Sequence, residues 1–322
     1  MNGRNMGGRS MNVRYRNSSY TKKRVKVIVT ISALTLAVIA VALLIIGNVL
    51  RASSDEKKEQ PIGSENDAVI DAGSDVPSAN GYSMSLSSVN SGTNTLNTYI
   101  NRAKGLGGNV LSFAARDTSG RELYSSELAV SMGKQSGSGR VSLRDIERGT
   151  GSSLRTSAGV NVSAFGESDA IYRSVLLAYD AGICAELYEG GVDDVFIRLT
   201  SGQVNSESID AVLNFADSVK KINPSVTIGI ALGKGFFALA DADTLIDRLS
   251  DRYDFLLYDL TDYTSASGDA IEYVRSNVDT AQLYIMMYDM RVMIPLAEDA
   301  IIADMVAALR SKSIDNWQVY MP

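Results

Sequence analysis

The sequence has no histidine, a single cysteine and one tryptophan among its 322 residues. Without histidine it lacks the commonest general base and transition-metal ligand, so a Ser-His-Asp hydrolase is excluded. The lone Cys184 allows neither an intramolecular disulfide nor a cysteine-based zinc site, and its place in an apolar helical pattern indicates a small buried side chain. We therefore expect no metal and no cofactor.

Phosphate-binding glycine motifs are missing as well. The glycine-rich stretch at 133–140, GKQSGSGR, does not lie between a strand and a helix start, as a dinucleotide fingerprint requires. It also lacks the Gly-Lys-Ser/Thr end of a phosphate loop. We interpret these residues as loop glycines.

Charge is distributed unevenly along the chain. Eight of the 31 basic residues lie in residues 1–26, where there is no acid, and residues 52–322 carry 22 bases against all 37 acids, a net charge of −15. The strong negative charge of residues 52–322 argues against binding to the phosphate backbone of nucleic acid.

A run without charge, Val27–Leu50, follows the basic segment. About 20 apolar residues span a bilayer as a helix, and flanking basic residues favour the cytoplasmic side. The run is longer than the apolar core of a cleaved signal peptide. We expect a cytoplasmic tail at 1–26, a transmembrane signal anchor at 27–50 and an extracytoplasmic remainder. Residues 51–93 are rich in Ser, Asn, Asp and Gly, which predicts a flexible linker.

The stretch from Tyr172 to Ser201 predicts one helix followed by one buried strand. Apolar residues recur at helical spacing up to Leu187, and Gly190 and Gly191 then end the helix. Such a helix–strand pair is the repeating unit of an α/β fold.

This unit repeats along residues 94–322. Seven strands are predicted, at 109–117, 160–166, 194–200, 226–232, 254–261, 282–289 and 316–320. Helices are predicted at about 94–104, 206–222, 241–250, 268–277 and 296–312, with weaker helical signals at 125–132 and 142–148. Continuous apolar strands separated by helices favour a (β/α)₈ barrel, with the eighth strand in 118–158 or the barrel incomplete. An open doubly wound sheet is the alternative.

Polar residues gather where the predicted strands end, which is where a barrel of this type carries its active site. The substrate-binding candidates at these ends are Arg116, Glu167, Arg198, Tyr258, Tyr288 and Asp289. Acids, arginines and tyrosines on one rim suit a carbohydrate. If the protein is an active glycosidase, Asp117 and Asp259 are the candidate catalytic carboxylates, since such enzymes need two of them.

Several segments resemble the glycosyl hydrolase domain family of bacterial envelope proteins. Residues 109–126, NVLSFAARDTSGRELYSS, are similar to its first strand, with Arg116 in place of a lysine and with Asp117 and Gly120 retained. The segments at 175–199, 256–263 and 317–322 are also similar. The resemblance implies a glycosidase-like barrel at the cell envelope, with cell-wall glycan or an envelope protein as partner.

One departure from that family bears on activity. Its strand corresponding to 194–200 carries an aspartate, whereas this chain has Ile197 or Arg198 there and no carboxylate between Val195 and Thr200. Loss of one of two essential carboxylates should abolish hydrolysis. The resemblance therefore favours an inactive, membrane-anchored barrel that binds glycan or a protein. An active hydrolase that pairs Asp117 with Asp259 or Glu167, and a purely structural envelope protein, are the alternatives.

Overall fold

A computed structural model describes residues 79–89, 93–117, 119–136, 141–167, 169–199 and 206–321. The tail predicted at 1–26 and the anchor predicted at 27–50 lie outside these ranges, as does most of the predicted linker. Within the described ranges, no helix combines the length and the apolar character needed to cross a membrane.

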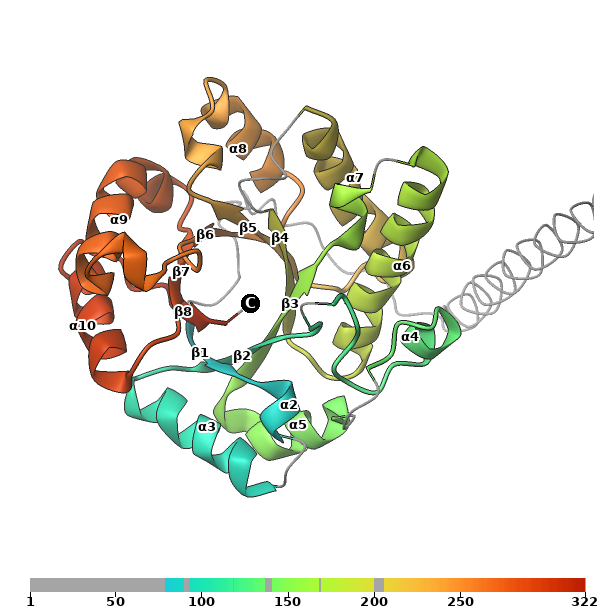
Figure 1. The fold of residues 1–322 in the computed structure, drawn as a ribbon, viewed down its shortest axis with the longest axis horizontal. Helices are drawn as coiled ribbons and strands as arrows, with labels where there is room; N and C mark the ends of the chain where they lie inside the picture. The colour runs from blue at the N-terminus through green and yellow to red at the C-terminus, as the bar shows by residue number, and fades with distance from the viewer. Residues whose placement is uncertain are drawn as a thin grey trace, which may run out of the picture. The chain divides into compact units, whose positions relative to one another are not determined.

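Eight parallel strands close into a barrel in which each strand pairs with the next and β8 pairs with β1 (Figure 1). The helices lie outside this ring (Figure 1). The predicted (β/α)₈ barrel is therefore confirmed, complete in its strands, and the open doubly wound sheet is wrong.

The strands are β1 (Asn80–Met84), β2 (Val110–Ala114), β3 (Arg155–Asn161), β4 (Asp194–Leu199), β5 (Ile228–Gly233), β6 (Phe255–Asp259), β7 (Arg291–Pro295) and β8 (Trp317–Tyr320). The α-helices are α2 (Leu86–Val89), α3 (Thr93–Gly105), α4 (Glu127–Ser131), α5 (Leu143–Thr150), α6 (Ala170–Glu189), α7 (Ser206–Ile222), α8 (Ala242–Ser250), α9 (Ala270–Met287) and α10 (Asp299–Arg310). Short 3₁₀ turns are η1 (Gly151–Ser153), η2 (Ser163–Gly166), η4 (Phe236–Ala238) and η5 (Ser265–Ser267).

The helix–strand unit at the centre of the chain forms as predicted. Asp169 caps α6 by accepting hydrogen bonds from the first backbone N–H groups of the helix. The helix ends at Glu189, and Gly191 then takes a φ of 96°, which side chains with a Cβ rarely adopt. All six residues of β4 are buried, as expected for a strand covered on both faces.

The eighth strand is β1, which lies inside the segment predicted as linker. The barrel therefore begins before residue 94, and the placement of the missing strand in 118–158 was wrong. The strand is only five residues long, NGYSM, and its flanks are polar, so composition does not reveal it. Pairing with β2 on one side and β8 on the other supplies the backbone hydrogen bonds that define it.

Two further strands lie elsewhere than predicted. Residues 282–289 continue helix α9 and its cap instead of forming a strand, and β7 follows at Arg291–Pro295. A short apolar run does not distinguish helix from strand by periodicity alone. β3 begins at Arg155, five residues before its predicted start. Its first five residues, RTSAG, are small or polar and lack the continuous apolar run by which strands were predicted.

The barrel interior is filled by side chains from alternate strand positions. A compact cluster occupies its middle, formed by Phe196, Ala231, Leu257, Met293 and Tyr320. The rings of Phe196 and Tyr320 meet edge to face, 5.2 Å apart. The barrel is thus a packed core rather than a channel, and only its ends are open to a ligand.

Near the N-terminal ends of the strands, Asp194 joins three strands through buried polar contacts. Its carboxylate lies 3.0 Å from a guanidinium nitrogen of Arg155 on β3 and 3.3 Å from one of Arg291 on β7. It also accepts a hydrogen bond from Ser157. The Arg291 guanidinium stacks on the Phe255 ring at 4.0 Å. These contacts engage the charged groups of Asp194, Arg155 and Arg291 in the packing of this end of the barrel.

Gly159 is required by the packing of this interior. A Cβ at this position would lie 2.7 Å from Cζ of Tyr320 and 2.8 Å from Cζ of Phe196, closer than side chains pack. We expect Gly159→Ala to lower the free energy of unfolding by about 1–3 kcal/mol, as overpacking does. Urea unfolding measures this difference. The matched control is Gly105→Ala in α3, where no heavy atom lies within 4 Å; equal losses in the two variants would refute the packing argument.

Candidate functional site

The mouth of the barrel at the C-terminal ends of the strands is occupied by an ion pair between β4 and β6. Nε and Nη2 of Arg198 donate to Oδ2 of Asp259 at 3.0 and 2.8 Å. The other carboxylate oxygen, Oδ1, accepts from the backbone N–H and the hydroxyl of Thr261 at 2.9 and 2.6 Å. Nη2 of Arg198 also donates to the Thr261 hydroxyl at 2.7 Å.

These contacts determine what Asp259 can do chemically. A carboxylate offers about four acceptor positions, and Arg198 and Thr261 use four. The Arg198 and Asp259 side chains retain only 9% and 5% of their exposure. Tyr320 closes the floor beneath them, with its ring centroid 5.6 Å from the Arg198 guanidinium. Asp259 therefore has a structural partner on each oxygen and no free position for a substrate.

Asp117, the other candidate catalytic carboxylate, shapes a tight turn after β2. Its Oδ1 accepts from the backbone N–H groups of Ser119 and Arg121, both at 2.9 Å, and from the Ser119 hydroxyl at 2.6 Å. Partial burial acts to raise the pKa of Asp117, but the hydrogen bonds from Ser119 and Arg121 outweigh it and hold that pKa below its ordinary value. Such a carboxylate is ionised at neutral pH and cannot serve as a general acid.

Glu167 lies directly after η2 and before α6. Its Oε1 accepts from the backbone N–H of Asp169 at 2.9 Å, and its carbonyl oxygen accepts from the Arg173 side chain at 2.8 Å. Both contacts fix the entry to α6. Among the described residues, the donors to Asp117, Glu167 and Asp259 come from three different parts of the chain, and no donor is shared between these carboxylates.

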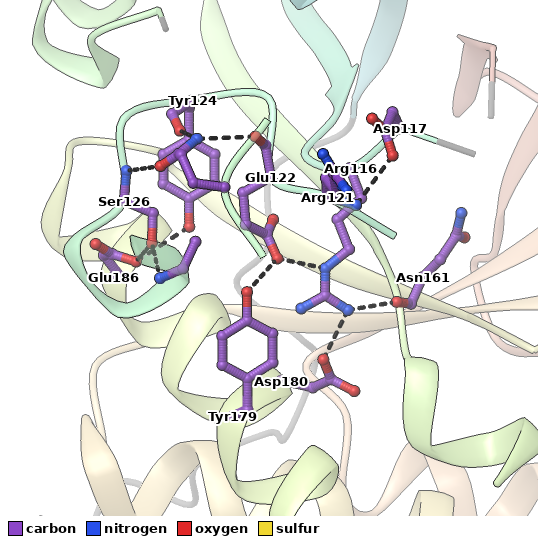
Figure 2. A network of polar contacts seen from close by, with 12 residues as sticks. Arg116, Asp117, Arg121, Glu122, Tyr124, Ser126, Asn161, Tyr179, Asp180 and Glu186 are labelled. Atoms are coloured by element: carbon purple, nitrogen blue, oxygen red, sulfur yellow. Dashed lines mark hydrogen bonds and ion pairs between the residues drawn. The ribbon is translucent and has the colours of Figure 1, made fainter. Parts of the chain in front are cut away.

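Arg116 is the centre of a second, fully buried network (Figure 2). Its Nε lies 2.5 Å from Oε1 of Glu122 and its Nη1 lies 2.6 Å from Oδ1 of Asp180 on α6. Nη1 also donates to the carbonyl oxygen of Asn161 at 2.7 Å. The Tyr179 hydroxyl donates to Oε1 of Glu122 at 2.9 Å. This arrangement clamps the turn after β2 onto α6 and leaves no opening for a substrate.

Burial sets the protonation behaviour of this network. Burial acts to lower the pKa of Arg116, but Asp180 and Glu122 outweigh it and raise that pKa above its ordinary value. Burial also raises the pKa values of Glu122 and Asp180, in spite of the opposing charge of Arg116. Close by, Glu186 of α6 accepts from the Ser126 hydroxyl at 2.6 Å (Figure 2), so a second carboxylate ties the same segment to the helix.

Three of the predicted rim residues do not face the mouth. Tyr258 points out of the barrel, where its hydroxyl donates to the carbonyl oxygen of Asn277 on α9 at 3.0 Å. The predicted positions of Tyr288 and Asp289 at a strand's C-terminal end are wrong, because they precede β7 instead of following it. A hydrogen bond to Asp247 raises the pKa of Tyr288 to about 12.

A pocket that the sequence did not reveal opens at the same end of the barrel, beside the mouth. It has a volume of about 440 Å³, within the range of small-molecule sites. Its walls come from the ends of β1, β7 and β8, from α3 and from the start of α10. The polar side chains that line it include Tyr82, Tyr99, Arg102, Glu298 and Asp299. None of the residues predicted for the site belongs to it.

One signal in the sequence could have located one of the missed residues. Asp180 is the one charged residue among the buried positions of α6, which marks it for a buried ion pair. The pocket lacks such a signal, since its wall from β1 depends on a strand hidden in polar sequence. No group of three or more Cys, Asp or Glu side chains in the described ranges could hold a metal ion.

Comparison with known proteins locates this chain by fold. No protein-family model matches the sequence, and no curated protein has a similar sequence. Among solved structures, a proposed α-L-fucosidase from Bacteroides thetaiotaomicron aligns over 80% of this chain and 91% of its own, with 13% identity and a TM-score of 0.52. The endo-1,4-β-mannanase from Rhizomucor miehei aligns over 76% of this chain and 85% of its own chain, with 12% identity and a TM-score of 0.51. The chain therefore has a TIM-barrel fold similar to that of glycosidases.

Proposed function

We propose that this protein is a membrane-anchored barrel of the glycosidase type that binds a saccharide outside the cytoplasm without hydrolysing it. Three observations support the proposal. The fucosidase and mannanase structures that share its fold carry the names of enzymes that act on glycans. The candidate catalytic carboxylates are engaged in structural contacts. The sequence places a basic segment and an uncharged run of membrane-spanning length ahead of the barrel.

The observation that carries the proposal is the ion pair between Arg198 and Asp259. A glycosidase needs one carboxylic acid that gives a proton and one carboxylate that attacks the sugar or activates water. Here the carboxylate of Asp259, at the end of β6, accepts four hydrogen bonds from Arg198 and Thr261. To react, Asp259 would first have to break a buried ion pair, which costs several kcal/mol.

Hydrolysis and binding are tested together on the full-length protein in detergent. We expect no release of sugar from aryl glycosides, β-mannan or peptidoglycan above the level of the Asp117→Asn/Asp259→Asn double variant. A general acid–base contribution would have been worth about 10²–10⁴-fold in rate. We also expect the protein to be retained on insoluble β-mannan, on insoluble peptidoglycan or on both.

The opposite result is equally clear. Hydrolysis by the wild-type protein that disappears in the double variant would identify an active enzyme with Asp117 and Asp259 as its carboxylates. Absence of retention on every glycan would leave the purely structural envelope protein as the better description. A useful control is Asp304→Asn, on the exposed side of α10, which should behave as wild type in both assays.

A further inference from the structure

The pocket beside the mouth is built by elements far apart in the sequence. Tyr82 on β1 and Arg102 on α3 approach Asp299, the first residue of α10. The Tyr82 hydroxyl donates to Oδ1 of Asp299 at 3.4 Å, and Nε of Arg102 lies 3.9 Å from Oδ2. Residues from the segments at 80–84, 93–105 and 296–300 thus line one space of about 440 Å³. The wall is therefore contributed by segments of β1, α3 and α10 and not by one loop.

The charges around this space are unequal. Arg102 contributes one positive charge, whereas Glu298 and Asp299 contribute two negative charges. Asp299 is engaged by Tyr82 and Arg102, but in the part of the chain that the structure describes the Glu298 side chain makes no ion pair. The pocket therefore has an acidic excess with an exposed carboxylate at its edge.

This charge pattern distinguishes between ligand classes. A helix N-terminus alone attracts anions, and barrels of this type often bind phosphate near the last strands. Here the N-cap Glu298 and the first-turn Asp299 place two negative charges at that position. They offset the positive end of the helix dipole and disfavour a phosphate or a carboxylate ligand. A ligand with hydroxyl groups and a positive charge fits better.

Aromatic and hydroxyl groups complete the lining. The partly buried Tyr99 packs against the apolar core and also lines the pocket, so it can offer part of its ring and its hydroxyl. Ser85 adds another hydroxyl. A few polar groups around a partly apolar wall are typical of sites that orient a small ligand.

We infer that this pocket binds a saccharide of one or two rings that carries a protonated amino group, with Glu298 as the partner of the ammonium. The inference rests on the proposed saccharide-binding function and places it beside the barrel mouth rather than in it. The Tyr99 ring packs against a C–H face of the sugar, and Ser85 contacts one of its hydroxyl groups. Arg102 and Tyr82 hold Asp299 in position as part of the wall.

The test uses a matched pair of ligands, cellobiose and the β-1,4-linked glucosamine disaccharide, which differ only in the groups at the 2-positions. Dissociation constants are measured by calorimetry with the full-length protein. We expect the amino disaccharide to bind about tenfold or more tightly than cellobiose, because a charged hydrogen bond is the stronger contact. Glu298→Gln should remove this preference. Asp304→Asn, which removes an equal charge from the same helix outside the pocket, should retain it.

A second variant tests the place of binding without relying on charge. Tyr99→Ala should raise the dissociation constants of both disaccharides about tenfold or more, with folding checked by thermal unfolding. Binding of either sugar that is unchanged in both Tyr99→Ala and Glu298→Gln would overturn the pocket assignment and leave the proposed function standing. A wild-type protein that binds neither disaccharide but is retained on an insoluble glycan would likewise overturn the pocket assignment alone. Failure to bind any saccharide would overturn both.

Discussion

Replacing Arg116 with methionine is expected to lower the free energy of unfolding by about 3–5 kcal/mol, the usual cost of breaking a buried ion pair from one side. The substitution removes the guanidinium that pairs with both Glu122 and Asp180, and the side chains of these two acids are fully buried. It also removes the guanidinium that donates to the Asn161 carbonyl. Urea unfolding followed by circular dichroism measures the loss.

The loss of free energy of unfolding in Arg116→Met should grow as the pH rises. Burial raises the folded-state pKa values of Glu122 and Asp180, and removal of Arg116 takes away the charge that opposes this rise. When the pKa of a carboxyl group is higher in the folded state than in the unfolded state, protonation of that group stabilises the folded state. This stabilisation is complete at pH values below the unfolded-state pKa and is lost as the pH rises through the folded-state pKa. The deficit of the variant should therefore be small near pH 4 and grow towards pH 7.

Two controls separate charge burial from simple truncation. The triple variant Arg116→Met/Glu122→Gln/Asp180→Asn removes all three charges and should recover a large part of the lost stability. Arg148→Met removes an exposed arginine whose partner Asp145 lies 3.2 Å away, and should change stability by less than about 1 kcal/mol. A triple variant less stable than Arg116→Met at pH 7 would contradict the electrostatic explanation.

Arg198→Met is the second substitution with a large expected effect, a loss of about 3 kcal/mol in the free energy of unfolding. This value is at the low end for a buried pair because the pair lies at the barrel mouth, where Arg198 and Asp259 retain 9% and 5% side-chain exposure. Oδ2 of Asp259 loses both of its donors and stays bonded only through Oδ1 to Thr261.

A double-mutant cycle with Asp259→Asn isolates the coupling between the two side chains. We expect the double variant Arg198→Met/Asp259→Asn to lose less free energy of unfolding than the two single variants lose in sum, with a difference of about 1 kcal/mol or more. Additive losses would show that Arg198 contributes through packing on Tyr320 and not through Asp259. Arg275→Met, at an exposed pair with Glu272 on α9, serves as the surface control.

Much of the architecture follows from local patterns in the sequence. The helices α6, α7, α8 and α10 and the strands β4, β5, β6 and β8 agree with prediction to within a few residues. Each has a strong apolar period or a continuous apolar run bounded by a cap, a glycine or a proline. The weaker helical signals at 125–132 and 142–148 correspond to α4 and α5. The misplaced segments are β1 in polar sequence, the start of β3, and the end of α9 in an apolar run.

The candidate site was less accessible to prediction. Arg116, Asp117, Arg198 and Asp259 were correctly placed at or just after strand ends, because strand boundaries can be read from the chain. Their partners were not, since Arg198 and Asp259 are 61 positions apart and Arg116 and Asp180 are 64 apart in the numbering. The roles proposed for them as ligand contacts stay predictions.

The sequence by itself determined the α/β barrel class and the absence of histidine chemistry, because periodicity and composition are local properties of the chain. It also located Arg198 at the end of a buried strand. Only the tertiary structure decided that Arg198 and Thr261 together engage both oxygens of Asp259, that Arg116 is enclosed by two carboxylates, and that a pocket forms between α3 and α10. Closure of the barrel brings β8 against β1 and so creates contacts between residues more than 200 positions apart, which no local pattern encodes.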